Sequence, residues 1–361
     1  RCSGCGHVQL GYVVAREKLF HGEYAYDMSV TDAGVRHFRE MADELCSRYP
    51  GTGKVLDIGS NTGVLLEGFQ ERGQDVLGVD PSANVQEMAE KRGVTTVEEF
   101  FDSDTAAEIS QDHGRMDIIT ATNVLAHVAD LHDTMEGVKR LLSRKGVLVI
   151  EVPYLRNLLE ENQFDTVYHE HLSYFSLNPL EKLFEKHGLE MIDVEERDIH
   201  GGSLRIHVSR EGERERNDRV DRFLEREEEE RLHSQERMEA FREEVEENRR
   251  ELRELIHGLR SEGNTVAGVG APAKGVTLLN YCGLDRSVIP YVTEKSELKI
   301  GKYVPGTHNR VVPDRKLLED QPDYALLLPW NFADSIMDNL QEYSDRGGKF
   351  IIPVPEPRIV E

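Results

Sequence analysis

The chain has 361 residues, more than one ordinary hydrophobic core holds, so its length predicts two domains with appended segments. A formal net charge of −24 argues against nucleic acid as a partner, because proteins that bind phosphate backbones need a basic surface. No apolar run reaches the roughly 18 residues of a membrane span, and residues 1–10 do not resemble a signal peptide, so we expect a cytoplasmic protein.

A pair of cysteines near the start of the chain indicates a metal site. Cys2 and Cys5 form a CxxC followed by Gly6, the turn of a zinc knuckle, but structural zinc takes four ligands and no second pair follows. Two hypotheses stay open: part of a structural zinc site, or an exposed pair of thiols. Four cysteines in all are too few for a disulfide scaffold.

The first two thirds of the chain alternate between helix and strand patterns. Apolar residues at helical spacing predict a helix over residues 31–49, and a helical pattern returns at 64–72 and 124–142. Short apolar runs predict buried strands at residues 54–58, 74–80, 116–121 and 146–152. Strands that alternate with helices indicate a parallel sheet covered on both faces, and we assign residues 31–210 to this α/β domain.

The last third contains a charged segment and a second α/β pattern. Residues 211–262 are rich in Glu and Arg and carry one apolar seam, which predicts a long helix or helix pair. The seam is either packed on the protein's own domains or used by a coiled-coil partner. Strand patterns at 265–269, 324–328 and 349–352 predict a smaller Rossmann-like domain over residues 263–361.

The loop between the first two strands has the pattern of an adenosine-cofactor site. It contains Asp57, Gly59, Ser60, Asn61 and Gly63, and it opens a helix whose N-terminus offers free N–H groups. A dinucleotide site needs G-x-G-x-x-G, and position 61 is not glycine. Asp80 ends the next strand, where its carboxylate can accept both hydroxyls of a ribose. The pattern favours S-adenosylmethionine; the alternative is a tight turn without a ligand.

Further polar residues follow the later strands. Asn123 and His127 come just after a strand, four residues apart, so one helical turn would place them on the same side. Tyr168, Glu170 and His171 belong to the densest cluster of proton-transfer groups, in which Glu170 can orient a histidine. The cluster lacks the spacing of a helical H-E-x-x-H zinc site, and a purely structural cluster remains the alternative.

Two other positions are candidate ligand contacts. His200 precedes Gly201 and Gly202, which permit an unusual turn close to a ligand or a simple loop bend. The stretch from Gly270 to Lys274 opens a helix, so helix N–H groups and Lys274 can form an anion site, or the loop can serve packing alone.

Together these segments resemble the C-methyltransferases of deoxysugar biosynthesis, which methylate nucleotide-linked 4-keto-6-deoxysugars. The resemblance covers nearly the whole chain and is most specific at residues 164–176 and 270–280. The other matching segments are 2–6, 57–63, 123–127, 200–204 and 329–331.

The resemblance implies three parts: a zinc-binding N-terminus, a class I S-adenosylmethionine-dependent methyltransferase domain of Rossmann-like α/β fold, and a smaller Rossmann-like substrate domain. Residues 1–30 then correspond to the remnant of the zinc domain and a linker. The family has two CxxC pairs there, and this chain carries only the later one, Cys2 and Cys5.

The resemblance also implies roles for the site residues. His171 removes the C3 proton beside the C4 keto group, Tyr168 and Glu170 assist, and the resulting enolate carbon attacks the methyl group. Asn123 and His127 face the sugar, where they would stabilise the enolate oxygen. Tyr24 or Tyr26 would close over the substrate.

Two other functions are weighed against this one. A nicotinamide-dependent oxidoreductase would use the C-terminal Gly-rich loop, but Gly268, Gly270 and Gly275 miss the required spacing. A non-catalytic S-adenosylmethionine-binding scaffold would recruit partners through the Glu/Arg helix, although it would not need Tyr168, Glu170 and His171. The sugar, the nucleotide and the oligomeric state are left open.

Overall fold

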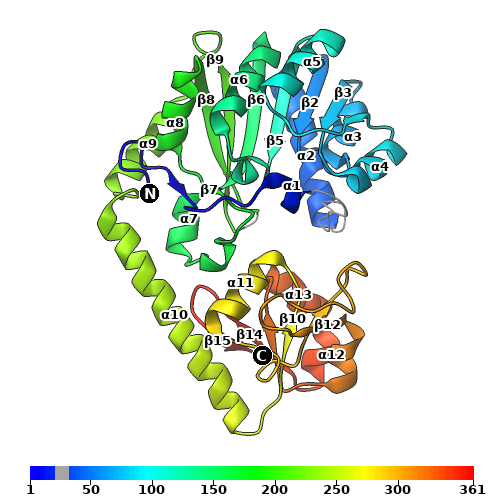
Figure 1. Cartoon of the computed structure of the whole chain (residues 1–361), viewed down its shortest axis with the longest axis vertical. Coiled ribbons are helices and arrows are strands. Elements are labelled where there is room, and N and C mark those ends of the chain that lie inside the picture. The colour runs from blue at the N-terminus through cyan, green and yellow to red at the C-terminus, as the bar shows by residue number, and fades with distance from the viewer. Residues whose placement is uncertain (21–31, 200) are drawn as a thin grey trace. The chain divides into compact units, whose positions relative to one another are not determined.

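The computed structural model describes residues 1–20, 32–199 and 201–361 of the chain. These residues divide into two compact units, each with its own sheet (Figure 1). The first unit comprises residues 1–155 and 169–233, and the second comprises 156–168 and 234–361.

The first unit is built on a sheet whose described strands have the order β4-β3-β2-β5-β6-β9-β8. The pairs from β4 to β6 are parallel, and the pairs β6–β9 and β9–β8 are antiparallel, so only β9 runs against the other strands. The order reverses between β2 and β5, which is where open α/β sheets bind ligands at the carboxyl ends of their strands. The strands are β2 (Lys54–Ile58), β3 (Asp75–Val79), β4 (Thr96–Val97), β5 (Met116–Thr122), β6 (Leu142–Pro153), β8 (Leu189–Arg197) and β9 (Ser203–Arg210).

Helices and short elements complete the first unit. Helices α2 and α3 pack on one face, where Phe38, Met41 and Leu45 bury their side chains against the central strands. The helices are α1 (Arg16–Leu19), α2 (Asp32–Arg48), α3 (Val64–Gln70), α4 (Ala83–Lys91), α5 (Ser103–His113), η2 (Leu125–His127), α6 (Leu131–Leu141), α8 (Leu177–Lys186) and α9 (Asp218–Glu229). A small antiparallel pair, β1 (Val8–Gln9) and β7 (Ser173–Tyr174), joins the N-terminal segment to the chain after His171.

The second unit is a smaller doubly wound domain, as the sequence pattern predicts. Its described strands have the order β12-β11-β10-β13-β14-β15, parallel except for β15. The strands are β10 (Val266–Val269), β11 (Tyr291–Glu294), β12 (Arg310–Pro313), β13 (Tyr324–Leu327), β14 (Lys349–Ile352) and β15 (Arg358–Val360). The helices are η3 (Phe164–Thr166), α10 (Gln235–Ser261), α11 (Ala273–Cys282), α12 (Arg315–Asp320), η4 (Trp330–Phe332), α13 (Ala333–Asn339) and α14 (Gln341–Asp345); α7 (Leu155–Glu160) spans the division between the units.

The charged segment divides between the two units. Helix α9 packs on β8, where Val220 is buried and Arg219 pairs with the buried Asp193. Helix α10 instead places Leu252 and Leu259 in the core of the second unit. The apolar seam is therefore packed within the chain, and the charged segment is a helix pair, one of the two forms that the sequence pattern predicts.

Candidate active site

The loop after β2 is a tight turn at the point where the strand order reverses. Gly59 and Gly63 adopt the left-handed region with φ of 69° and 77°, and Gly63 caps the start of α3. A Cβ on Gly59 would lie 2.8 Å from a methyl carbon of Val124, so a larger residue would displace the β5 loop. Glycine at position 59 thus lets two carboxyl-end loops approach each other closely.

Two buried carboxylates lie at this turn. A carboxylate oxygen of Asp80 accepts the backbone N–H of Asn61 at 2.9 Å, and its other oxygen accepts that of Ser82 at 3.0 Å. Asp57 accepts the hydroxyl of Thr120 at 2.7 Å. Burial raises the pKa of Asp57 to about 7, with a further contribution from the Asp80 carboxylate. Burial also raises the pKa of Asp80, against the hydrogen bonds from Ser82 and Asn61.

This turn fits a cationic cofactor that carries a ribose. Each Asp80 oxygen retains a second lone pair for a hydroxyl group, and a positive ligand would offset the cost of keeping two buried carboxylates charged. Among the described residues, the buried hydroxyl of Ser60 has no hydrogen-bond partner, so a ligand group can satisfy it.

Asn123 and His127 lie beside this turn, at the carboxyl end of β5. Asn123 takes a left-handed conformation with φ of 56°, and its N–H donates to the carbonyl of Glu151 at 2.8 Å. The turn that follows is η2, whose last residue is His127. A non-glycine residue at positive φ is strained unless its surroundings hold it, and such strain is concentrated at functional sites.

The His127 ring faces His171, with ring centroids 5.1 Å apart in an edge-to-face arrangement. The Nδ1 atom of His127 lies 2.8 Å from the carbonyl oxygen of Glu170. A carbonyl only accepts, so Nδ1 carries the proton and Nε2 offers a lone pair. Burial lowers the pKa of His127, against hydrogen bonds to the backbone of Glu170 and Asn123, which favours the neutral ring.

Glu170 and Tyr168, the other predicted members of the cluster, have different surroundings. The backbone carbonyl of Glu170 orients the His127 ring. Burial raises the pKa of the Glu170 side-chain carboxyl group. Tyr168 is half-buried and ends the segment that groups with the second unit. Leu172, directly after His171, donates its N–H to the carbonyl of Ala126 at 2.7 Å, which fixes the chain beside η2.

A polar layer that the sequence analysis missed lies on the α2 face of the sheet. Thr122 pairs in register with Glu151, and Glu151 with Arg205, so the three side chains share one face near the carboxyl ends. Arg205 and Glu151 are buried and form two contacts of 2.9 and 3.0 Å, and His37 of α2 reaches Glu151 at 2.7 Å. A single carboxylate within the apolar run of β6 was the available signal.

The pKa of Glu151 is lowered by its partners in this layer. Burial alone would raise it, but the hydrogen bond to His37 and the charge of Arg205 lower it overall. The backbone carbonyl of Glu151 also accepts the N–H of Asn123, so this polar layer helps to fix the backbone of the candidate site.

The Gly-rich loop of the second unit packs closely on neighbouring side chains. A Cβ on Gly270 would lie 2.7 Å from Pro329, and one on Gly268 would lie 2.6 Å from Val292. The N–H of Ala271 donates at 3.1 Å to Glu294, the acidic residue that ends β11. These contacts hold the loop tightly within the unit, and its glycines lack the G-x-G-x-x-G spacing, which disfavours the oxidoreductase hypothesis.

Lys274, at the start of α11, is half-buried in this unit. Its ammonium lies 3.8 Å from the centroid of the Trp330 ring and donates to the side-chain oxygen of Asn331. Burial lowers the pKa of Lys274 to about 8, and Asp165 opposes that shift.

The remaining predicted residues are less informative. Cys2 is exposed and Cys5 half-buried; backbone hydrogen bonds from Cys5 and then Gly4 lower the pKa of Cys2, as suits a thiolate ligand. Within the described ranges, no group of three or more His, Cys, Asp or Glu side chains could hold a metal ion. Tyr24, Tyr26 and His200 lie outside the described residues.

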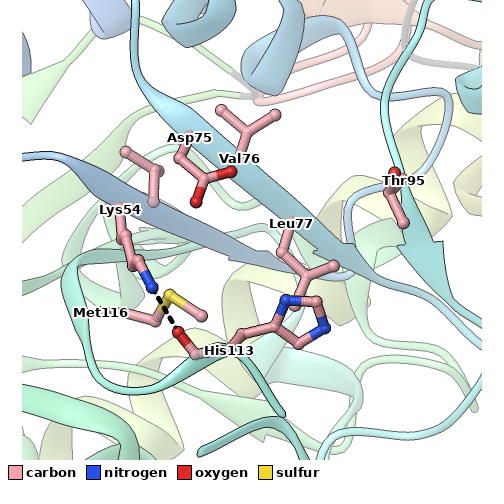
Figure 2. Close-up of a pocket in the computed structure, with 8 residues that line it drawn as sticks. Lys54, Asp75, Val76, Leu77, Thr95, His113 and Met116 are labelled. Carbon is pink, nitrogen blue, oxygen red and sulfur yellow. Dashed lines mark hydrogen bonds between the residues drawn. The ribbon is translucent and has the colours of Figure 1, made fainter.

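A pocket of about 120 Å³ lies at the amino ends of the strands of the first sheet, opposite the Asp57–Gly63 turn (Figure 2). Lys54, Asp75 and Met116, which begin β2, β3 and β5, are among its lining residues. The pocket is smaller than the roughly 300 Å³ of typical small-molecule sites and lies at the amino ends of the strands, so it is not the candidate active site.

Comparison with known proteins decides the family. Residues 35–194 match the family described as methyltransferase domain, and residues 198–355 match the C-methyltransferase C-terminal domain. The chain is 38% identical to the C-methyltransferase NovU of Streptomyces niveus over 362 aligned residues, covering 99% of this chain and 86% of that protein. The chain belongs to the C-methyltransferase family.

A further relative and two solved structures are similar to part of this C-methyltransferase. A ubiquinone biosynthesis O-methyltransferase of Azorhizobium caulinodans is 31% identical over 34% of this chain and 47% of its own length. A solved S-adenosylmethionine-dependent methyltransferase from Clostridium acetobutylicum has a TM-score of 0.41 at 14% identity, covering 51% of this chain and 94% of that one. Magnesium protoporphyrin IX methyltransferase of Synechocystis, solved with S-adenosylhomocysteine, has a TM-score of 0.39 at 15% identity over 52% of this chain and 90% of its own.

By its strand order and its family matches, the C-methyltransferase has the class I S-adenosylmethionine-dependent methyltransferase fold and a second C-terminal domain, and it is an S-adenosylmethionine-dependent enzyme. In the part of the chain that the structure describes, none of the helices is both long and apolar enough to cross a membrane.

Proposed function

We propose that this enzyme methylates C3 of a nucleotide-linked 4-keto-6-deoxysugar, with His171 as the base. The observation that carries the proposal is the pairing of His171 with His127 at the carboxyl end of β5, beside the Asp57–Gly63 turn. The sugar class rests on the resemblance of residues 164–176 to enzymes with that activity. A C–H acid needs a base, whereas transfer to oxygen or nitrogen often needs positioning alone.

The two imidazoles divide the work in this proposal. His171 takes the proton that the neighbouring keto group acidifies. His127 stays neutral, because burial lowers its pKa and a second positive ring with its centroid 5.1 Å away would be repelled. Its unprotonated Nε2 then cannot donate to an enolate oxygen, so we assign that donation to the amide of Asn123 and not to His127.

Binding roles are proposed residue by residue. S-Adenosylmethionine supplies the methyl group; Asp80 would accept its ribose hydroxyls, with Asp57, Gly59, Ser60, Asn61 and Gly63 forming the turn around it. Lys274 and the N-terminus of α11 would hold the diphosphate of the sugar nucleotide. Tyr24, Tyr26 and His200 remain candidate sugar contacts.

Zinc is proposed only as a structural group. Cys2 and Cys5 would supply two of its four thiolates, and no step of the reaction involves them. Metal analysis tests this role: zinc that is lost in Cys5→Ser would support it, and zinc at the same level in that variant would remove both cysteines from the site.

Product analysis tests the proposal. The enzyme is incubated with S-adenosylmethionine and a panel of nucleotide-linked 4-keto-6-deoxysugars, and mass spectrometry and NMR locate the added methyl group. We expect it on C3, with His171→Ala slower by roughly 10²–10⁴-fold, the usual contribution of a general base. His169→Ala is the matched control, since His169 is an exposed neighbour. A methyl group on oxygen, or near-normal turnover by His171→Ala, would refute the proposal.

A further inference from the structure

A buried acid lies three residues before Tyr168, in a part of the chain that the reaction does not use. Asp165 belongs to η3, and its side chain is fully buried in the second unit. One of its carboxylate oxygens accepts the indole N–H of Trp330 at 2.7 Å. A buried carboxylate is costly unless it is hydrogen-bonded or paired, so its neighbours carry the argument.

The charge that acts on Asp165 is that of Lys274. Burial raises the pKa of Asp165 to about 6 and lowers that of Lys274 to about 8, and each charge opposes the shift of the other. The same ammonium lies over the ring of Trp330, whose N–H bonds to Asp165. Acid, indole and ammonium therefore form one cluster, in which the acid and the indole are buried. Cys282 of α11 also senses the Asp165 charge, though burial is the main reason its pKa rises to about 12.

The backbone at Asp165 is fixed from a second side. Phe164 is buried in the core of the second unit, with its ring 5.5 Å from that of Tyr281 on α11. The chain then continues through Tyr168 to Glu170 and His171. Any shift of η3 is passed along few bonds to these residues, and a displacement of about 1 Å can cost on the order of a hundredfold in rate.

We propose that Asp165 is a positioning residue for the Tyr168–His171 segment, and that its cluster with Trp330 and Lys274 responds when Lys274 binds a diphosphate. The second part rests on the proposed function, which assigns the sugar-nucleotide diphosphate to Lys274. A diphosphate draws the ammonium away from Asp165 and Trp330. Asp165 then loses the positive charge of Lys274. Its contacts within η3 change, and η3 leads directly into the Tyr168–His171 segment.

Hydrogen–deuterium exchange tests the anchor without any substrate. Asp165→Asn keeps an acceptor for the Trp330 N–H and removes the charge, and Trp330→Phe keeps the ring and removes the donor. We expect faster exchange in residues 167–175 of both variants. Asp323→Asn is the control, because Asp323 is an exposed acid of the same unit that accepts two hydrogen bonds from Thr265. Exchange in Asp165→Asn equal to that control overturns the anchor.

Kinetics separate positioning from a merely structural effect. Asp165→Asn should lower kcat on the order of tenfold to a hundredfold while the Kd of S-adenosylmethionine stays unchanged. A kcat like that of Asp323→Asn, or a parallel loss of cofactor binding and of folded protein, would contradict a positioning role.

Trp330 is the only tryptophan of the chain and reports on Lys274 directly. Thymidine diphosphate should change its emission and the exchange of residues 167–175 in the wild type, and thymidine alone should not. Asp165→Asn should lose the exchange response. Calorimetric binding of the diphosphate with no change in emission overturns the response but leaves the proposed function standing. Absence of diphosphate binding overturns both the response and the nucleotide part of the proposed function, whereas the exchange result for Asp165→Asn still decides the anchor.

Discussion

At the scale of single residues, the acids at the end of β2 and β3 explain why a positively charged cofactor suits this turn. Asp57 and Asp80 are buried close enough for the charge of one to raise the pKa of the other. Their positions were predictable, because a strand followed by a glycine turn and a second strand ending in Asp fixes both addresses. Their environment was not, since it depends on Thr120 and on backbone N–H groups that the fold brings together.

The raised pKa of Asp57 gives a measurable linkage. S-Adenosylmethionine is cationic and stabilises the carboxylate, so its binding lowers a pKa of about 7 and releases protons near neutral pH. Affinity should therefore rise with pH from about 6 to about 8. Calorimetry in buffers of different ionisation enthalpy measures the release. Asp57→Asn should abolish it, and Asp75→Asn, an exposed acid at the start of β3, should not. Proton uptake, or release that persists in Asp57→Asn, would be the wrong result.

At the scale of elements, α9 shows how a charged helix becomes part of a core. Glu227 is fully buried and accepts the N–H groups of Leu177 and Asn178 at the start of α8, at 2.7 and 3.0 Å. It also accepts the hydroxyl of Tyr154 at 3.0 Å. A carboxylate there satisfies the free N–H groups and complements the helix dipole.

Glu227→Ala should accordingly destabilise the first unit. The variant leaves two helix N–H groups and a buried hydroxyl without their acceptor, at a cost of about 1–3 kcal/mol for each group left unsatisfied. Chemical denaturation measures the loss, with Glu228→Ala, an exposed neighbour on α9, as the control. Equal stability of the two variants would show that Glu227 does not cap α8.

The contact of Glu227 with the start of α8 also shows what the sequence could not predict about the elements. The repeated glutamates of residues 211–262 look equivalent, and only the fold singles out Glu227. The alternation of strands and helices predicted β2, β3, β5 and β6 within a few residues, because buried parallel strands are short apolar runs. The antiparallel strands β8 and β9 were missed, since their alternating charged residues, such as Arg205 and Glu195, resemble a solvated segment.

At the scale of the whole molecule, the described residues form two compact units, and the segment 156–168 leaves the first unit to join the second. The sequence predicted both α/β domains but not this excursion, because residues 156–168 carry no breaker or composition change. The segment 156–168 ends at Tyr168. Glu170 and His171, which are proposed for proton removal, come directly after it in the chain. The proposed roles of Tyr168, Glu170 and His171 therefore depend on how this segment is held.

Deuterium incorporation by the full chain is the sharpest check on proton removal at carbon. The 4-keto sugar nucleotide is incubated in D₂O with S-adenosylhomocysteine in place of S-adenosylmethionine, so that no methyl group can be transferred. The wild type and His169→Ala should exchange the C3 proton, and His171→Ala should not. Methyl transfer by the wild type under normal conditions, together with C3 exchange that is absent or independent of His171, would contradict the account.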